Sequence, residues 1–253
     1  MKINKKIINA RRNKILSEIQ THNEVWVNEL SKQLNVSPLT IRRDLQFLEE
    51  DGFVERFYGG ARFKENKNTD NNEIYEDNII HSLAKCAANY IEDNDTIFIN
   101  SSKTALYVIQ YINSKNVTVI TNNCKIFLLK SNPNVSIFAT GGEFNPIKKS
   151  FTGEFALRNL NKVSATKCFL GCSGINSNGI TTVIPQEVAK NECMLERCIG
   201  DVFIIADSSK IGREYSFLSG SIKKINTLIT NAPISEELIN IQKRGVKVIQ
   251  INT

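Results

Sequence analysis

The chain has 253 residues, 41% of them hydrophobic, and its 32 Lys and Arg against 26 Asp and Glu give a net charge of +6; this is typical of a globular protein with one small and one larger domain. No long apolar stretch follows the basic N-terminus, and the longest apolar runs are too short to cross a bilayer, so we expect a cytoplasmic protein with no signal peptide and no membrane partner. The six cysteines form no C-x-x-C pair and the chain has only two histidines, so we expect reduced thiols, no metal site and no cofactor.

Most of the excess positive charge lies near the N-terminus. Residues 1–64 contain 12 Lys and Arg against 8 Asp and Glu, whereas residues 65–253 contain 20 against 18. The segment from Lys2 to Lys14 holds six cations and no acidic residue. Basic termini are often solvated tails, but this distribution favours a polyanionic partner for the N-terminal part of the chain.

Two helices are predicted before residue 35. Residues 7–20 carry aliphatic side chains at helical spacing on one face. A short extended piece over residues 25–27 leads into a second helix at about residues 28–34. The turn that follows contains Asn35, which can take the left-handed conformation that a helix C-terminus often requires.

A third helix is predicted from residue 38 to an Asp-Gly pair that is suited to ending it. Ser37 is a good N-cap, and Pro38 fits the first helical position because that N–H is unpaired in any case. Residues 53–63 alternate in part and contain a Gly-Gly turn, which predicts a β-hairpin. This order is that of a winged helix-turn-helix, with the helix-turn-helix at about residues 27–46.

The third helix has an apolar and a polar face. At about 100° per residue, Ile41, Leu45 and Leu48 fall on one stripe and are expected to pack inward. Arg and Gln on the opposite face can reach base edges in a DNA major groove, while a hydroxyl or the helix N-terminus holds a phosphate. Each of these residues alone fits an ordinary solvated helix, but the turn, the cap, the hairpin and the basic N-terminus together favour DNA. The helix residues expected at DNA are Ser37, Leu39, Thr40, Arg42, Arg43 and Gln46.

The sequence "ELSKQLNVSPLTIRRDLQFLEEDGFVERFYGGA" resembles the N-terminal signature of DeoR-family bacterial transcription regulators, a resemblance that covers roughly residues 10–63. It implies that "TIRRDL" belongs to the recognition helix and that the Gly-Gly hairpin forms the wing. Asn35 stands where the family usually has glycine. The wing residues expected at double-stranded DNA are Arg56, Tyr58, Gly59 and Gly60.

The rest of the chain predicts an α/β domain. Residues 64–73 have almost no apolar content, so we place a linker over residues 64–75, between a DNA-binding domain at 1–63 and a second domain at 76–253. Apolar strands then alternate with helices, which predicts a mainly parallel sheet covered on both faces. The strands are expected at residues 96–100, 117–121, 135–140, 166–171, 202–206, 227–230 and 246–250.

Small polar residues follow five of these strands. Ligands of open parallel sheets collect beyond the carboxyl ends of the strands, and Ser, Thr and Lys at helix N-termini suit anions. Any one of these loops is equally well an ordinary turn, but five at one edge favour a phosphorylated small ligand. The loops are "NSSKT" at 100–104, "TNN" at 121–123, "TGGEF" at 140–144, "GCSG" at 171–174 and "ADSSK" at 206–210.

The segments "DTIFI", "TVITNN", "TGGEF", "FLGCSGI", "GITT" and "ADSSKIGR" resemble the DeoR-family sensor domain, from about residue 76 to the C-terminus. That domain is similar in fold to ribose phosphate isomerases and coenzyme A transferases and senses phosphorylated sugars or related metabolites. The family usually has a G-T-T-like loop where this chain has "SSKT", and often an aspartate where it has Ser173, so the resemblance does not specify the ligand. The effector residues it implies are Ser101, Ser102, Thr104, Thr121, Asn122, Gly141, Gly142 and Lys210.

Two functions are compatible with this organisation. The first is a repressor of a carbohydrate-utilisation operon, homo-oligomeric through its sensor domain and controlled by a phosphorylated sugar. The second is a sugar-phosphate isomerase-like enzyme with an accessory DNA-binding domain, which needs a general base such as Glu143, Glu187 or Asp207. Ser173 in place of an aspartate weakens the second reading. We therefore expect a regulator rather than an enzyme.

Overall fold

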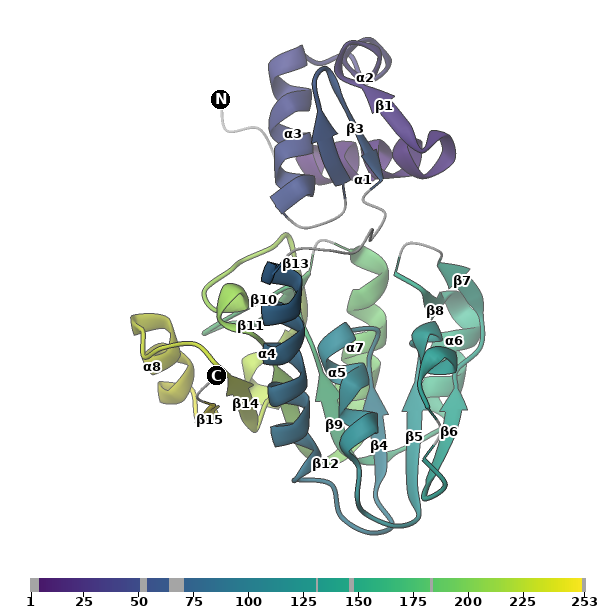
Figure 1. The fold of residues 1–253 in the computed structure, drawn as a ribbon, viewed down its shortest axis with the longest axis vertical. Coiled ribbons are helices and arrows are strands. Elements are labelled where there is room, and N and C mark those ends of the chain that lie inside the picture. Colours follow the sequence, from purple (N-terminus) through teal and green to yellow (C-terminus); the bar gives the residue numbers. More distant parts are fainter. Residues whose placement is uncertain are drawn as a thin grey trace. The chain divides into compact units, whose positions relative to one another are not determined.

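The computed structural model describes residues 5–50, 54–63, 71–130, 132–145, 148–182 and 184–251 (Figure 1). Contacts within the chain divide it into two compact units, residues 1–69 and 70–253. The division falls inside the linker predicted over residues 64–75. The Asp-Gly pair predicted to end the third helix, at residues 51–52, lies outside the described residues.

The N-terminal unit is a set of three helices with a small antiparallel sheet, which confirms the predicted winged helix-turn-helix. The sequence predicts that the extended piece at residues 25–27 merely connects two helices. In the structure this piece forms a third strand of the wing sheet. The sheet order is β1-β3-β2. The elements are α1 (Lys5–His22), β1 (Glu24–Trp26), α2 (Val27–Gln33), α3 (Pro38–Glu50), β2 (Val54–Phe57) and β3 (Gly60–Phe63).

An apolar stripe determines the orientation of α3. Ile41, Leu45 and Leu48, which were predicted to face inward, are each at most 1% exposed. They belong to one cluster with Ile15 and Ile19 of α1. Because burial of one aliphatic side chain contributes about 1.5–3 kcal/mol, this stripe decides which side of α3 is presented to solvent.

The turn between α2 and α3 is closed by local hydrogen bonds. Asn35 has a φ of 50°, the left-handed conformation that the sequence predicts. The Ser31 hydroxyl donates to the Val36 carbonyl at 2.6 Å. The Ser37 hydroxyl oxygen accepts from the Thr40 N–H at 3.2 Å, as expected of an N-cap. These bonds fix the residue at which α3 begins.

The wing hairpin differs from the predicted Gly-Gly turn. Its loop consists of Tyr58 and Gly59, and Gly60 is already paired with Phe57 as the first residue of β3. Gly59 has a φ of 91°, which favours glycine. A Cβ at Gly60 would lie 2.3 Å from the Val25 carbonyl oxygen and 2.7 Å from the Phe57 ring. The second glycine is therefore required by a close approach of β1, and the turn itself needs only the first.

Asp44 is a charged residue on the buried side of α3, with 2% of its surface exposed. It accepts hydrogen bonds from Arg11 Nε at 2.6 Å and from Arg12 Nε at 2.9 Å. The Arg12 guanidinium also lies over the Phe47 ring, 3.6 Å from its centroid. Two of the six cations near the N-terminus thus pair within the unit, so fewer remain for a polyanionic partner than the sequence predicts.

We expect Asp44→Asn to destabilise the N-terminal unit by about 2–4 kcal/mol, because two largely buried guanidinium groups lose their carboxylate. Trp26 is the one tryptophan of the sequence, so urea unfolding followed by tryptophan fluorescence reports on this unit. The control is Glu55→Gln, which breaks the exposed pair with Arg62 and should change the free energy of unfolding by less than about 0.5 kcal/mol. Equal effects of the two substitutions would contradict this account.

The second unit contains a seven-stranded parallel sheet, with the order β15-β14-β12-β9-β4-β5-β6. All seven predicted strands are present and all belong to this sheet, which confirms the predicted α/β architecture. Their bounds are β4 (Thr96–Ile99), β5 (Val117–Thr121), β6 (Val135–Ala139), β9 (Ala165–Leu170), β12 (Cys198–Ile205), β14 (Thr227–Thr230) and β15 (Lys247–Gln250).

Among the residues that the structure describes, five further strands are short and antiparallel, and none of them was predicted from the sequence. They form a hairpin of β7 and β8 and a three-stranded sheet in the order β10-β11-β13. Strands of three to five residues carry too few side chains for a clear period of two. Their bounds are β7 (Glu143–Asn145), β8 (Ser150–Thr152), β10 (Gly174–Asn176), β11 (Gly179–Thr182) and β13 (Phe217–Ser221).

Helices cover both faces of the parallel sheet. Successive residues of β4 face opposite sides, with Ile97 and Ile99 in one core cluster and Phe98 in the other. The first cluster includes side chains of α4 (Asn71–Ala88), α5 (Lys103–Tyr107) and the 3-10 helix η1 (Val108–Tyr111), and the second those of α6 (Gly153–Asn161), α7 (Pro185–Arg197) and α8 (Glu236–Lys243). Further 3-10 helices are η2 (Cys124–Leu128), η3 (Ser208–Lys210) and η4 (Ile222–Lys224). Within the described part of the chain, no helix combines the length and apolarity that a membrane span requires.

The strand order reverses between β4 and β9. From β4 the chain adds β5 and then β6 on one side, and it returns to place β9, β12, β14 and β15 on the other. Loops that leave β4 and β9 therefore diverge, and a crevice opens between them at the carboxyl edge of the sheet. Figure 1 shows β4 and β9 side by side near the middle of this sheet.

Candidate functional site

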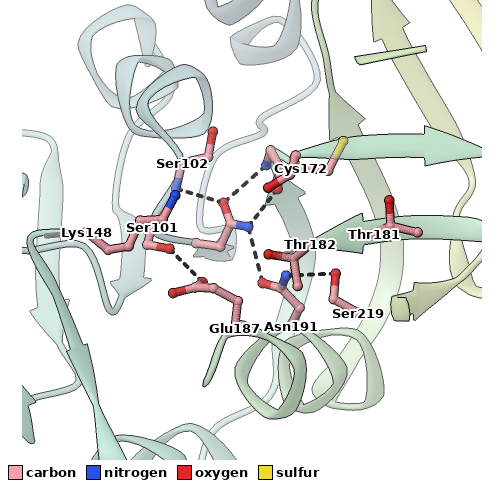
Figure 2. Close-up of a pocket in the computed structure, with 12 residues that line it drawn as sticks. Ser101, Ser102, Lys148, Cys172, Thr181, Thr182, Glu187, Asn191 and Ser219 are labelled. Carbon is pink, nitrogen blue, oxygen red and sulfur yellow. Dashed lines mark hydrogen bonds between the residues drawn. The ribbon is translucent and has the colours of Figure 1, made fainter. Parts of the chain in front are cut away.

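A cavity of about 120 Å³ lies where the strand order reverses (Figure 2). Its walls come from the loops after β4 and β9, from β11 and β13, from α7 and from the segment between β7 and β8. Hydroxyl and amide groups predominate. The lining residues are Asn100, Ser101, Ser102, Lys148, Gly171, Cys172, Ser173, Thr181, Thr182, Glu187, Asn191 and Ser219.

Asn100, 3% exposed, joins the ends of β4 and β9. Its Oδ1 accepts from the Gly171 N–H at 3.1 Å and from the Ser102 N–H at 3.2 Å. Its Nδ2 donates to the Gly171 carbonyl at 2.8 Å and to Asn191 Oδ1 at 3.2 Å. Asn191 in turn donates to the Ser219 hydroxyl at 3.4 Å. A single amide therefore ties two strand ends to α7 and fixes the back of the cavity.

Glu187 is the carboxylate among the described residues of the cavity wall, and it is 7% exposed. It accepts from the Ser101 hydroxyl at 2.7 Å, as Figure 2 shows, and from Lys190 Nζ at 2.9 Å. Lys190 is 2% exposed and also donates to the Phe151 carbonyl at 3.4 Å. A buried carboxylate needs such partners. Held by Lys190, it presents acceptor lone pairs towards the cavity.

Lysines surround this end of the sheet. Lys148 lines the cavity. Burial lowers the pKa of Lys125, and the nearby charges of Lys149 and Lys103 lower it further. Clustered cations with few carboxylates create a positive potential, which attracts and retains an anion.

Lys210 is a further cation whose charge acts on Cys172 at the cavity wall. Burial raises the pKa of the Cys172 thiol to about 12, and the nearby charges act in opposite directions, that of Lys210 lowering this pKa and that of Asp207 raising it. Lys210 must therefore lie within electrostatic range of Cys172, although it does not line the cavity. A thiol with this pKa stays protonated near neutral pH, so Cys172 acts as a small neutral wall residue.

Two of the eight predicted effector residues, Ser101 and Ser102, line the cavity. Ser102 also caps α5, its hydroxyl accepting from the Ala105 N–H at 3.4 Å. The structure does not bring the other six to the wall of this cavity. They are Thr104, Thr121, Asn122, Gly141, Gly142 and Lys210.

Five of these six residues have other places in the fold. Thr121 and Asn122 are fully buried at the end of β5. The Thr121 hydroxyl oxygen accepts from the Asn123 N–H at 3.0 Å, and the Asn122 amide donates to the Phe151 carbonyl at 3.3 Å. Gly141 and Gly142 have φ values of 63° and 114° in the turn before β7. Thr104 lies in the first turn of α5.

Of the α7 residues at the site, only Glu187 was considered from the sequence, as a candidate general base, and Lys190 and Asn191 were not predicted. Glu187, Lys190 and Asn191 are buried at positions i, i+3 and i+4 of this helix, so they share one face. Three polar residues at this spacing, on a helix that also buries Cys193, Met194 and Leu195, were the available signal. Within the described ranges, no group of three or more His, Cys, Asp or Glu is placed to hold a metal ion.

The predicted DNA-facing residues of α3 are accessible. Leu39 is 56% exposed, and Arg42, Arg43 and Gln46 are exposed as well. Ser37 and Thr40 lie together at the start of the helix, with their hydroxyl oxygens 2.9 Å apart. This face therefore presents two guanidinium groups, an amide and two hydroxyls.

Some of the predicted wing residues are exposed to solvent, and others contact neighbouring parts of the N-terminal unit. Tyr58 is fully exposed at the tip, beside Gly59. Arg56 is paired with Glu49 of α3, with 2.7 Å between Nε and Oε2. Gly60 is buried against β1 and shapes the wing, and its predicted contact with DNA stays a prediction.

We expect Asn100→Ala to destabilise the sensor unit by about 2–4 kcal/mol, because buried amide and carbonyl groups on two strands lose their partner. Thermal unfolding followed by far-UV circular dichroism measures this loss. Asn161→Ala, at the exposed end of α6, is the matched control and should change stability by at most about 0.5 kcal/mol. An unchanged melting temperature for Asn100→Ala would show that the two strand ends hold together without it.

Two family models match this chain. The chain matches a DeoR-like helix-turn-helix domain over residues 11–67 and a DeoR C terminal sensor domain over residues 81–232. It is 31% identical to the uncharacterized HTH-type transcriptional regulator YulB of Bacillus subtilis, covering 97% of each chain. It is also 31% identical to the lactose phosphotransferase system repressor of Streptococcus mutans, covering 92% of this chain and 96% of that protein.

Among solved structures, ribose 5 phosphate isomerase A from Neisseria gonorrhoeae aligns with 53% of this chain and 53% of its own, at 16% identity and a TM-score of 0.39. Ribose 5-phosphate isomerase A from Methanocaldococcus jannaschii covers 53% of this chain and 54% of its own, at 12% identity and a TM-score of 0.38.

Proposed function

Because this chain belongs to the DeoR family of DNA-binding transcription regulators, we propose that it represses a carbohydrate-utilisation operon under the control of a phosphorylated sugar. The observation that carries the proposal is the cavity at the reversal of strand order. This is the position at which open parallel sheets bind small ligands. A relative that covers nearly the whole chain is named a lactose phosphotransferase system repressor, which supports a link to carbohydrate uptake.

The chemistry of the cavity suits a phosphorylated polyhydroxyl compound. Serine and threonine hydroxyls and the Asn191 amide, which keeps one N–H and one oxygen lone pair beyond its bonds to Asn100 and Ser219, can donate to and accept from sugar hydroxyls. Glu187 adds a strong acceptor, which compensates for the absence of an aspartate at Ser173. Lys148 at the wall supplies positive charge for a phosphate. Neutral hydroxyl-binding groups beside cations are what a sugar phosphate requires.

Binding accounts for this site better than catalysis does. An isomerase needs a carboxylate that is free to abstract a proton from carbon. Both oxygens of Glu187 are engaged, one by Ser101 and one by Lys190. The site therefore holds its carboxylate in place as an acceptor. We infer that the chain acts on DNA in the cytoplasm without turning over its ligand.

The proposed function is tested by measuring binding to the DNA upstream of the chain's own gene by fluorescence anisotropy, with a panel of sugar phosphates as competitors. We expect tight binding that falls steeply with salt, because Lys and Arg displace counterions from phosphates. At least one sugar phosphate should release the DNA. Binding that is insensitive to salt and to every phosphorylated sugar of the panel would count against the proposal.

Arg43→Ala should weaken binding to the upstream DNA by about 5- to 150-fold, since a bidentate contact between arginine and a base is worth about 1–3 kcal/mol. Arg43 is exposed on the side of α3 away from its buried stripe. Arg244→Ala removes an equally exposed arginine from the sensor unit and should leave DNA affinity unchanged. If both variants bind as the wild type does, α3 does not read the DNA through Arg43.

Lys148→Ala and Lys210→Ala should keep DNA affinity but raise the sugar-phosphate concentration for half-release by about tenfold or more. The reason is the loss of a charge-assisted contact or of positive potential at the cavity. The control is Lys243→Ala, which lies on α8 and outside the cavity wall. An unchanged response in both cavity variants would place the phosphate elsewhere.

A further inference from the structure

The parallel sheet of the sensor unit ends at β6, and this edge lacks the usual protection. β6 pairs with β5 along one side and is the terminal strand of the sheet order. Its sequence, Val-Ser-Ile-Phe-Ala, contains no charge and no proline. The strand at the opposite edge, β15, instead begins with the exposed Lys247. Proteins normally shield edge strands with charges, proline, bulges or covering segments. The β6 edge is thus open to pairing with another strand.

Large apolar side chains gather around the β6 edge. Ile137 and Phe138 are 37% and 59% exposed, and as consecutive residues they face opposite sides of the sheet. Figure 1 places β6, β7, β8 and α6 together at this end of the sheet. Clustered exposed apolar groups mark interaction surfaces. Six of the ten large apolar side chains described as exposed in this unit fall here: Phe127, Leu128, Ile137, Phe138, Phe144 and Phe155.

The edge is complementary to a second copy of itself. Two β6 strands related by a two-fold axis pair antiparallel, so the open N–H and C=O groups of each strand meet those of the other. The residues of β6 are uncharged, so the two paired strands themselves bring no like charges together. Ile137 and Phe138 then pack beside their symmetry mates, one on each face of the joined sheet.

We propose that β6 is the subunit interface of this protein, through which two copies form one continuous sheet. The proposal rests on the proposed function in one respect: a regulator with one recognition helix per chain gains affinity when a pair of chains reads two half-sites. The exposed side chains of η2, β7 and α6 extend the contact beyond the strand. A stable dimer buries roughly 1,200–2,000 Å², more than one five-residue strand provides alone.

Sedimentation equilibrium of the full chain tests this interface. The wild type should have twice the 28.5 kDa of one chain at micromolar concentration. With the two-fold axis at Ile137, the centre of β6, Ile137→Lys places a cation opposite its own copy and Phe138→Lys places one diagonal to its copy, so each should raise the dimer dissociation constant by about tenfold or more. The matched control is Ile234→Lys, since Ile234 is 78% exposed next to α8 and should leave the constant within about twofold.

Circular dichroism checks that the lysine variants remain folded. If either variant unfolds, hydrogen exchange of the wild type is measured in place of that variant's sedimentation. The β6 amides should become more protected as the protein concentration rises through the range in which the dimer forms. A monomeric wild type, a dimer that both lysine variants leave intact, or β6 amides without concentration-dependent protection overturns the proposal. A monomer that still binds upstream DNA would contradict the proposed interface but not the proposed function. A dimer formed through β6 that binds no DNA would contradict the proposed function but not the interface.

Discussion

The hydrogen bonds of the Asn100 amide are the interaction on which the sensor unit depends most. Adjacent strands β4 and β9 are separated in the chain by about seventy residues, and their loops leave in different directions. One buried side chain bonds the end of β4 to Gly171 and to α7. Because the strand order reverses at this point, the ends must stay together while the loops diverge. The cavity is the space that this constraint leaves.

The N-terminal unit depends on a comparable division between buried and exposed faces. The aliphatic stripe of α3 is packed against α1, and the Asp44 carboxylate on the same side is held by two arginines of α1. Both contacts fix the orientation of α3 about its own axis. Arg42 and Arg43 consequently face solvent at the positive end of the helix dipole, where repulsion is relieved by an external anion. Under the proposed function, a DNA phosphate backbone would supply that anion.

Much of the fold could be predicted because its signals are local. The seven parallel strands are buried on both faces and read as continuous apolar runs, and the Asn35 turn and the Ser37 cap are specified by neighbouring residues. The loops after β4 and β9 were predicted as ligand-binding for the same reason.

What could not be predicted depends on residues distant in the chain. Glu187 was considered from the sequence only as a general base, and its bond with Ser101 of a distant loop depends on how α7 packs. Asp44 likewise meets Arg11 and Arg12 across more than thirty residues. Gly60 is required by the close approach of β1, a strand more than thirty residues earlier, and not by the turn in which it was placed. Pattern and spacing along the sequence carry no information about such pairs.

We propose that the effector binds where the strand order reverses and that its binding there releases DNA. The most direct measurement is hydrogen exchange of the full chain with the sugar phosphate that releases upstream DNA most strongly. We expect this compound to increase the protection of backbone amides in two segments, residues 100–102 after β4 and 171–173 after β9. This protection should appear over the same concentrations at which DNA is released. Release of DNA with protection confined to other parts of the chain would contradict it.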